Sequence, residues 1–144
     1  MKETTYDFQD GNGAVPAKRH INPDGSIGGW VADTAEVYEN AYVYENAKVY
    51  GNAKVFGDAW VFGDALVSDN AKVCGKAWVS GNAEVWGNAR VFEDAEVSEN
   101  AMVFENASVF GDAEVSGNAK VFGDAWAYGN AKLSGNSKIT LDKP

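Results

Sequence analysis

Cysteine, histidine and proline are scarce in this chain of 144 residues, which contains one cysteine, one histidine and three prolines. The single cysteine, Cys74, excludes an internal disulfide framework. The first residues, MKETTYDFQDGNG, lack the apolar stretch of a secretory signal. Nowhere does an apolar run approach the roughly 18 residues that a membrane-spanning helix needs. We therefore expect a soluble, cytoplasmic protein without a membrane partner.

Positively charged residues are also few. The chain has 12 lysines and arginines and 21 aspartates and glutamates, which gives a formal net charge of −9. A protein that binds nucleic acid without sequence preference gains its affinity from a positive surface that releases counterions. Attraction to anionic lipids needs the same sign of charge. The composition therefore predicts neither direct nucleic-acid binding nor adsorption to an anionic membrane.

What the chain has in abundance is a six-residue repeat, which begins at Val31 and reads VADTAE, VYENAY, VYENAK, VYGNAK and VFGDAW. Every sixth residue from Val31 to Ile139 is Val, Leu or Ile, except Ala127. Every sixth residue from Ala35 onward is Ala until Ser137. A short period that never slips marks a solenoid, whose coils bury a shared core by stacking. The period matches neither an α-helical turn nor a coiled-coil heptad.

Alternation within each repeat separates an inner surface from an outer one. Ala and the aliphatic residue lie two positions apart, so they point to the same side of a short strand. The positions between them include charged side chains that must stay in water, among them Lys48, Lys54, Lys72, Glu84, Arg90, Glu96, Glu114 and Lys120. We therefore expect Ala and Val to form the core. Most repeats end in Gly or an acid followed by Asn or Asp, residue types that adopt left-handed turn conformations, and Lys76 is the one basic residue at the Asn/Asp position.

This pattern, an aliphatic residue followed after two positions by Asn or Asp and a small residue, resembles the hexapeptide-repeat, left-handed parallel β-helix family. The resemblance covers about three quarters of the chain. It implies an all-β fold, a parallel β-helix (β-solenoid) of about six triangular coils of 18 residues over residues 31–140. Residues 1–30 would form an N-terminal cap segment, and residues 141–144 a C-terminal tail. Glycine departs from the family pattern by lying two places after the aliphatic residue.

Coils of 18 residues would stack residues 18 apart in columns on the outer faces. One face gathers five aromatic residues in its first coils, which are Tyr42, Tyr44, Trp60, Phe62 and Trp78. Aromatic ladders can simply stabilise a sheet, by roughly 0.2–1 kcal/mol for each neighbouring pair. A contiguous patch of this size is larger than a monomer normally exposes, which favours a partner. The family resemblance implies a homotrimer, so we expect a homo-oligomer, with another protein as the alternative partner.

A second face places three cations in one column, Lys54, Lys72 and Arg90, beside Phe56 and Phe92. These cations and the five aromatic residues are the candidate ligand- and partner-binding residues. Cations next to aromatic rings suit a small nucleotide as well as a protein surface.

Candidate catalytic residues are few. Many hexapeptide proteins are acyltransferases with a histidine general base, and others are carbonic anhydrases with three histidine zinc ligands. The single histidine, His20, is the only candidate base, and it cannot supply a three-histidine site. It lies in the irregular opening segment, where a capping role is the alternative. Cys74 has no histidine near it in the repeat and is interpreted as a small hydrophobic residue. We expect no metal and no cofactor.

Three functional hypotheses follow. The first, which the uninterrupted repeat favours, is a non-catalytic β-solenoid that acts as a self-assembling scaffold or binding module. The second is a minimal acyltransferase with His20 as base. The third is a phage counter-defence factor, either an acidic mimic of DNA or a protein that sequesters a signalling nucleotide. Phage origin rests on the segments DGNGAVPAKRH and NPDGSIGGWVADTA, which resemble the openings of short phage-borne and prophage-borne members of the family.

Overall fold

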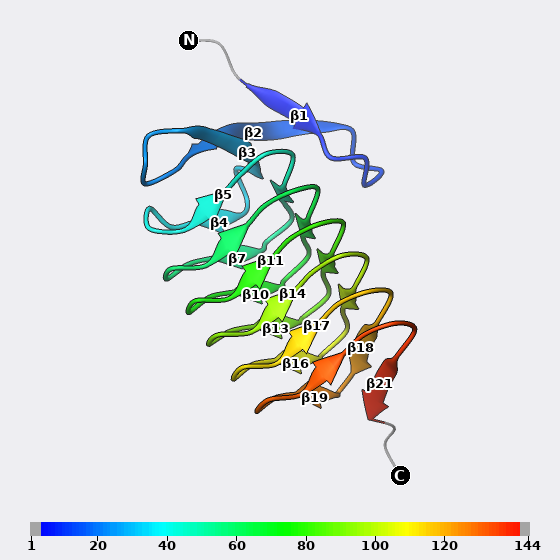
Figure 1. Cartoon of the computed structure of the whole chain (residues 1–144). Coiled ribbons are helices and arrows are strands. Elements are labelled where there is room, and N and C mark those ends of the chain that lie inside the picture. Colours follow the sequence, from blue (N-terminus) through cyan, green and yellow to red (C-terminus); the bar gives the residue numbers. More distant parts are fainter. Residues whose placement is uncertain (1–3, 142–144) are drawn as a thin grey trace.

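The six-residue repeat folds into a parallel β-solenoid whose coils wind around a single core (Figure 1). A computed structural model describes residues 4–141, and within these residues there are strands and turns but no helix. The strands form three sheets, one on each side of the coil. The predicted all-β solenoid of about six coils is confirmed. The left-handed winding that the family resemblance implies stays a prediction.

Two of the sheets consist of six parallel strands with two residues each. The first, here the cationic face, contains β4 (Glu36–Val37), β7 (Lys54–Val55), β10 (Lys72–Val73), β13 (Arg90–Val91), β16 (Ser108–Val109) and β19 (Trp126–Ala127). The second, here the aromatic face, contains β5 (Tyr42–Val43), β8 (Trp60–Val61), β11 (Trp78–Val79), β14 (Glu96–Val97), β17 (Glu114–Val115) and β20 (Lys132–Leu133).

The third sheet has nine strands because the N-terminal segment joins it. Its parallel part contains β3 (Ile27–Ala32), β6 (Lys48–Val49), β9 (Leu66–Val67), β12 (Glu84–Val85), β15 (Met102–Val103), β18 (Lys120–Gly123) and β21 (Lys138–Leu141). In the parallel parts of all three sheets, paired residues lie 18 positions apart, as Lys54 and Lys72 do, and Lys72 and Arg90. The columns predicted from the repeat are therefore the columns of the structure.

The core is a stack of alanine and valine side chains. All the repeat positions of these two types from Ala41 to Val121 are completely buried. The residues between them lie outside, which confirms the predicted division into inner and outer positions. Small and β-branched side chains suit this core because a coil of three short strands encloses little space and extended backbone favours branching at Cβ.

Turns between the strands need a residue with left-handed backbone conformation at the first of their two turn positions. From Glu45 to Gly135 the first residue of each turn pair has a positive φ, with values such as +67° at Gly57 and +64° at Gly81, whereas Glu39 in an earlier turn does not. Glutamate occupies the same conformation in four turns, including Glu99 at +59°. Among residues 4–141 no Asn or Asp at the second turn position has a positive φ. The sequence suggested a left-handed conformation for both residue types, and the structure assigns it to the first position only.

The N-terminal segment covers one end of the solenoid (Figure 1). β1 (Thr5–Asp7) pairs antiparallel with β2 (Ala14–Ile21), which pairs antiparallel with β3, and β3 then runs parallel to β6. A small second core forms beneath this layer from Phe8, Ala17 and Ala32. β3 spans the expected boundary between residues 30 and 31, because Trp30 already pairs with Lys48 of the first complete coil.

Candidate functional site

Five aromatic side chains lie in contact on the aromatic face and form what we call the aromatic patch: Tyr42, Tyr44, Trp60, Phe62 and Trp78. They come from β5, β8 and β11 and from the residues that follow β5 and β8. The indoles of Trp60 and Trp78 are stacked with their centroids 5.6 Å apart and an interplanar angle of 16°. Tyr42 lies against Trp60 at 4.6 Å, and Phe62 meets Trp78 edge-on at 5.8 Å. The 18-residue spacing thus brings all five predicted residues together.

The rings of the aromatic patch remain open to solvent in this chain. Trp78 is 43% exposed, and the other four side chains are half-buried. Each aromatic contact of this kind is worth about 0.5–1.5 kcal/mol beyond the area it buries, so the rings hold one another in place. The result is a preorganised apolar surface on a rigid sheet, which is a favourable surface for docking another protein.

Tyr44 connects the aromatic patch to the N-terminal cap. Its hydroxyl donates a hydrogen bond of 2.9 Å to Oδ2 of Asp24, and Ser26 donates to Oδ1 of Asp24 from its hydroxyl and its backbone N–H. The Ser26 bonds, followed by the Tyr44 bond, lower the pKa of Asp24. Desolvation, followed by the bond to Asp24 and its charge, raises the pKa of Tyr44 to about 12. The network fixes the edge of the patch nearest the cap.

The three predicted cations line a groove of about 480 Å³ on the cationic face, here called the cation groove. Its walls are formed by Asn52, Lys54, Asn70, Lys72, Asn88 and Arg90. The cations come from β7, β10 and β13, which are adjacent strands, and the asparagines from the turns just before them. Within residues 4–141 the one ion pair joins Lys132 to Glu114, so Glu36, the cross-strand neighbour of Lys54, forms no ion pair with the cation groove.

Cys74 follows β10 and lies half-buried beside the cation groove. Burial raises the pKa of its thiol, and the charges of Lys72 and Arg90 oppose that rise. The thiol form is therefore favoured at neutral pH, and thiolates rather than thiols are the nucleophiles. This environment agrees with its interpretation as a small hydrophobic side chain.

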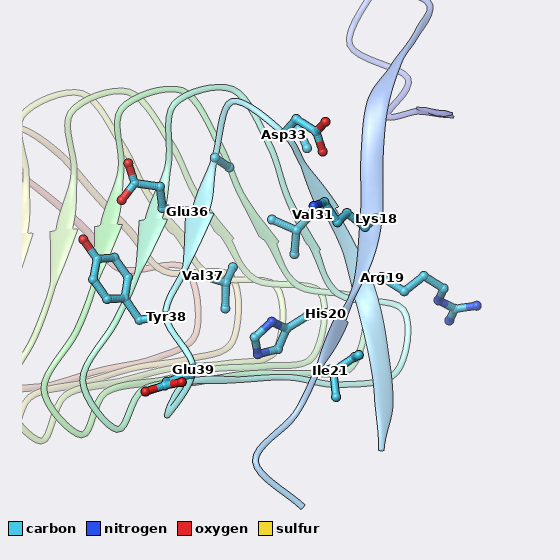
Figure 2. A pocket seen from close by; sticks show the side chains of 12 residues that line it. Lys18, Arg19, His20, Ile21, Val31, Asp33, Glu36, Val37, Tyr38 and Glu39 are labelled. Atoms are coloured by element: carbon cyan, nitrogen blue, oxygen red, sulfur yellow. The ribbon is translucent and has the colours of Figure 1, made fainter. Parts of the chain in front are cut away.

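His20 lies in β2 and lines an open pocket of about 790 Å³ between the cap and the first coil. Figure 2 shows its ring pointing toward Val37 of β4, whereas Arg19 points away from the pocket. Nε2 of His20 is 2.9 Å from the carbonyl oxygen of Ala41, so this nitrogen carries the proton and donates it. The ring has a structural partner, which agrees with a capping role for this histidine.

Asn22 makes the most complete capping interaction. Its side-chain amide accepts a hydrogen bond from the N–H of Val43 at 2.8 Å and donates one to the carbonyl of Val43 at 3.2 Å. Asn22 is 2% exposed. Its amide takes the place that the peptide group of a preceding coil would occupy beside Val43. His20 does the same for the carbonyl of Ala41. Nothing in the sequence marks Asn22, because its role depends on a contact 21 residues away in the chain.

The pocket lies over a strand edge that the cap leaves open. β3 covers β6, and Asn22 with His20 covers β5, but among residues 4–141 β4 pairs only with β7. By the alternation of a parallel ladder, the N–H of Val37 and the carbonyls of Ala35 and Val37 point toward the pocket. The pocket therefore combines a strand edge with the apolar side chains of Ile21, Val31 and Val37.

The chain is thus a parallel β-solenoid with 18-residue coils and a strand-rich N-terminal cap, and the aromatic patch, the cation groove and the pocket at His20 are its three candidate sites. Comparison with models of protein families, with curated proteins and with solved structures found no match. No helix between residues 4 and 141 is long and apolar enough to cross a membrane. Over the same residues there is no group of three or more His, Cys, Asp or Glu side chains placed to hold a metal ion.

Proposed function

We propose that this chain is a non-catalytic scaffold that assembles with copies of itself through the aromatic patch. The observation that carries the proposal is the continuous contact among five aromatic rings on one flat face, with Trp78 still 43% exposed. Burying these rings against a second molecule removes apolar surface from water and costs little side-chain entropy, because the rings already hold one another. A homotrimer is the assembly we propose.

The test is the native mass of the purified protein, measured by light scattering coupled to size exclusion at low and high salt. We expect three times the chain mass at both salt concentrations, because apolar contacts are not screened as charge contacts are. Trp78→Ser should give a monomer. Trp126→Ser is the matched control, since Trp126 is an exposed tryptophan, 63% accessible, on the cationic face. A wild-type monomer would contradict self-assembly and leave the patch to another protein.

The pocket next to His20 favours a second candidate function, acyl transfer with His20 as general base. Nδ1 of His20 is the nitrogen that would take a proton, because Nε2 donates to Ala41. Acyl transfer needs both binding of acyl-coenzyme A and dependence on this histidine. Equilibrium dialysis with acetyl-coenzyme A tests the first requirement, and His20→Gln tests the second while keeping a side-chain donor for the Ala41 carbonyl. Absence of binding would exclude this function.

A further inference from the structure

We propose that the cation groove binds a linear oligophosphate, either free or as part of a nucleoside triphosphate. The groove lies on a different sheet from the aromatic patch, so this inference does not depend on the proposed function. Its six lining residues are three cations and three asparagines, and they repeat in register over three successive coils. Every one of these side chains can donate hydrogen bonds to phosphate oxygens.

The electrostatics of the groove call for an anion. Lys54, Lys72 and Arg90 occupy paired positions on adjacent strands, which are about 4.8 Å apart, so three positive charges repel one another along one line. In the whole chain acids outnumber bases by nine, and Glu36 of β4 is the cross-strand neighbour of Lys54. Within residues 4–141, however, neither Glu36 nor any other carboxylate forms an ion pair with these three cations. The nearby acid Asp69 directs its Oδ2 to the N–H of Gly87 at 3.1 Å.

The spacing selects the kind of anion. The three cations span about 10 Å along the solenoid axis, because they lie on three consecutive strands. A chain of phosphoryl groups places negative charge continuously along such a line, whereas a single small anion reaches only part of it. Arginine adds two parallel donors at one end of the groove, and lysines contribute compact charges along the rest. A linear oligophosphate therefore matches the groove in length and in donor chemistry.

The neighbouring column offers a place for a nucleobase. Phe56, Cys74 and Phe92 each come directly after a strand that carries a cation, and both phenylalanine rings are half-buried. The small Cys74 side chain interrupts the aromatic column, so the two rings are separated by two strand spacings, about 10 Å. A flat base can stack on either ring in this interval while its phosphates lie along the cations. Because only a nucleoside triphosphate can make this stacking contact, it should bind the cation groove more tightly than a free oligophosphate does.

The experiment is isothermal titration calorimetry of tripolyphosphate into the full chain at low salt. The test variant combines Lys54→Gln, Lys72→Gln and Arg90→Gln. The matched control combines Lys120→Gln, Lys132→Gln and Lys138→Gln, which removes the same charge outside the groove. We expect at least a tenfold loss of affinity in the test variant and less than a threefold loss in the control. Circular dichroism of both variants verifies that the solenoid is intact, and Lys72→Gln alone is the milder version of the test.

The rate at which Cys74 is alkylated is a second measurement, and it shows whether phosphate binds in the cation groove. Bound phosphate neutralises Lys72 and Arg90, so alkylation of Cys74 by iodoacetamide should slow in the wild type and in the control but not in the test variant. Titration with ATP separates the two ligand sources: tighter binding than tripolyphosphate indicates a nucleoside triphosphate, and equal binding indicates the oligophosphate alone. Absence of tripolyphosphate binding, or equal losses in both triple variants, would overturn the proposal. The native mass is measured separately, so either proposal can fail alone.

Discussion

At the scale of the residue, the turns contain the clearest local strain. Glu99 has a φ of +59°, whereas glycine occupies the equivalent position in most coils. A left-handed conformation costs a residue with a Cβ roughly 1–2 kcal/mol, and glycine avoids most of that cost.

Replacing Glu99 by glycine should therefore stabilise the fold by about 0.5–1 kcal/mol, after the greater flexibility of glycine in the unfolded chain is subtracted. The midpoint of urea unfolding measures the effect. Glu96→Gly is the control, because Glu96 lies in strand β14 of the same coil and outside the turns. It should lower the midpoint. A Glu99→Gly midpoint at or below that of the wild type would contradict the strain argument.

Asp24 and Tyr44 give the cap a dependence on pH at both extremes. The lowered pKa of Asp24 means that its contribution is complete above the unfolded value of 3.8 and is lost as pH falls through the folded value. The raised pKa of Tyr44 means that its contribution is complete below the unfolded value of 10.0 and is lost as pH rises through about 12.

NMR titration should therefore show the pKa of the Asp24 carboxyl below 3.8, and ultraviolet absorbance should show the pKa of Tyr44 at about 12. Asp24→Asn removes the negative charge, so Tyr44 should then ionise at a lower pH than in the wild type. An unchanged tyrosine titration in this variant would show that the Asp24 contact is not formed in solution.

At the scale of the element, strand β3 packs so closely that its glycines are required. A Cβ added to Gly28 would lie 1.7 Å from the carbonyl oxygen of Val43, and one added to Gly29 would lie 1.9 Å from that of Ala47. These distances are far below any van der Waals contact, and both obstacles are backbone atoms. The cap therefore lies directly on the backbone of the first coil.

Gly28→Ala should displace the cap and expose the β5 edge that Asn22 now covers. We expect faster hydrogen exchange of the Val43 amide. Asn22→Ala should have a similar local effect and lower the free energy of unfolding by about 2 kcal/mol, because it leaves the N–H and carbonyl of Val43 unpaired. Gly25→Ala is a useful comparison, since a Cβ there has open space but an unfavourable φ of +87°. Unchanged exchange at Val43 in both cap variants would contradict this account.

At the scale of the whole molecule, the solenoid behaves as a stack of interchangeable coils. Strand residues pair with partners 18 positions away, so each coil is stabilised by its neighbours. Removing residues 93–110 would join Phe92 to Gly111 and keep the repeat in phase.

The shortened protein should fold with the same β-sheet circular dichroism and a lower melting temperature, because one coil interface is lost. The aromatic patch and the cation groove lie before the deletion, so both should be retained. Removing nine residues instead, 93–101, puts the inward positions out of phase and should abolish cooperative melting. Cooperative melting of that control would show that the phase of the repeat does not determine the core.

Everything that follows from the six-residue repeat could be inferred from the amino-acid sequence alone. A strict period of six residues sets which side chains face inward and which stack in columns, so the core, the aromatic patch and the column of Lys54, Lys72 and Arg90 could be predicted without coordinates. The translational symmetry of a solenoid makes a spatial neighbour equivalent to a fixed separation in sequence.

The way in which the chain before the repeat covers the first coil became clear from the coordinates. Asn22 and His20 replace missing peptide groups at Val43 and Ala41, and Gly28 admits the close approach, but no periodic spacing marks these residues. The left-handed φ of the first turn residue, the open β4 edge and the groove between the asparagines and cations also required coordinates. The physical reason is that each depends on backbone direction and side-chain packing between segments that no repeat relates.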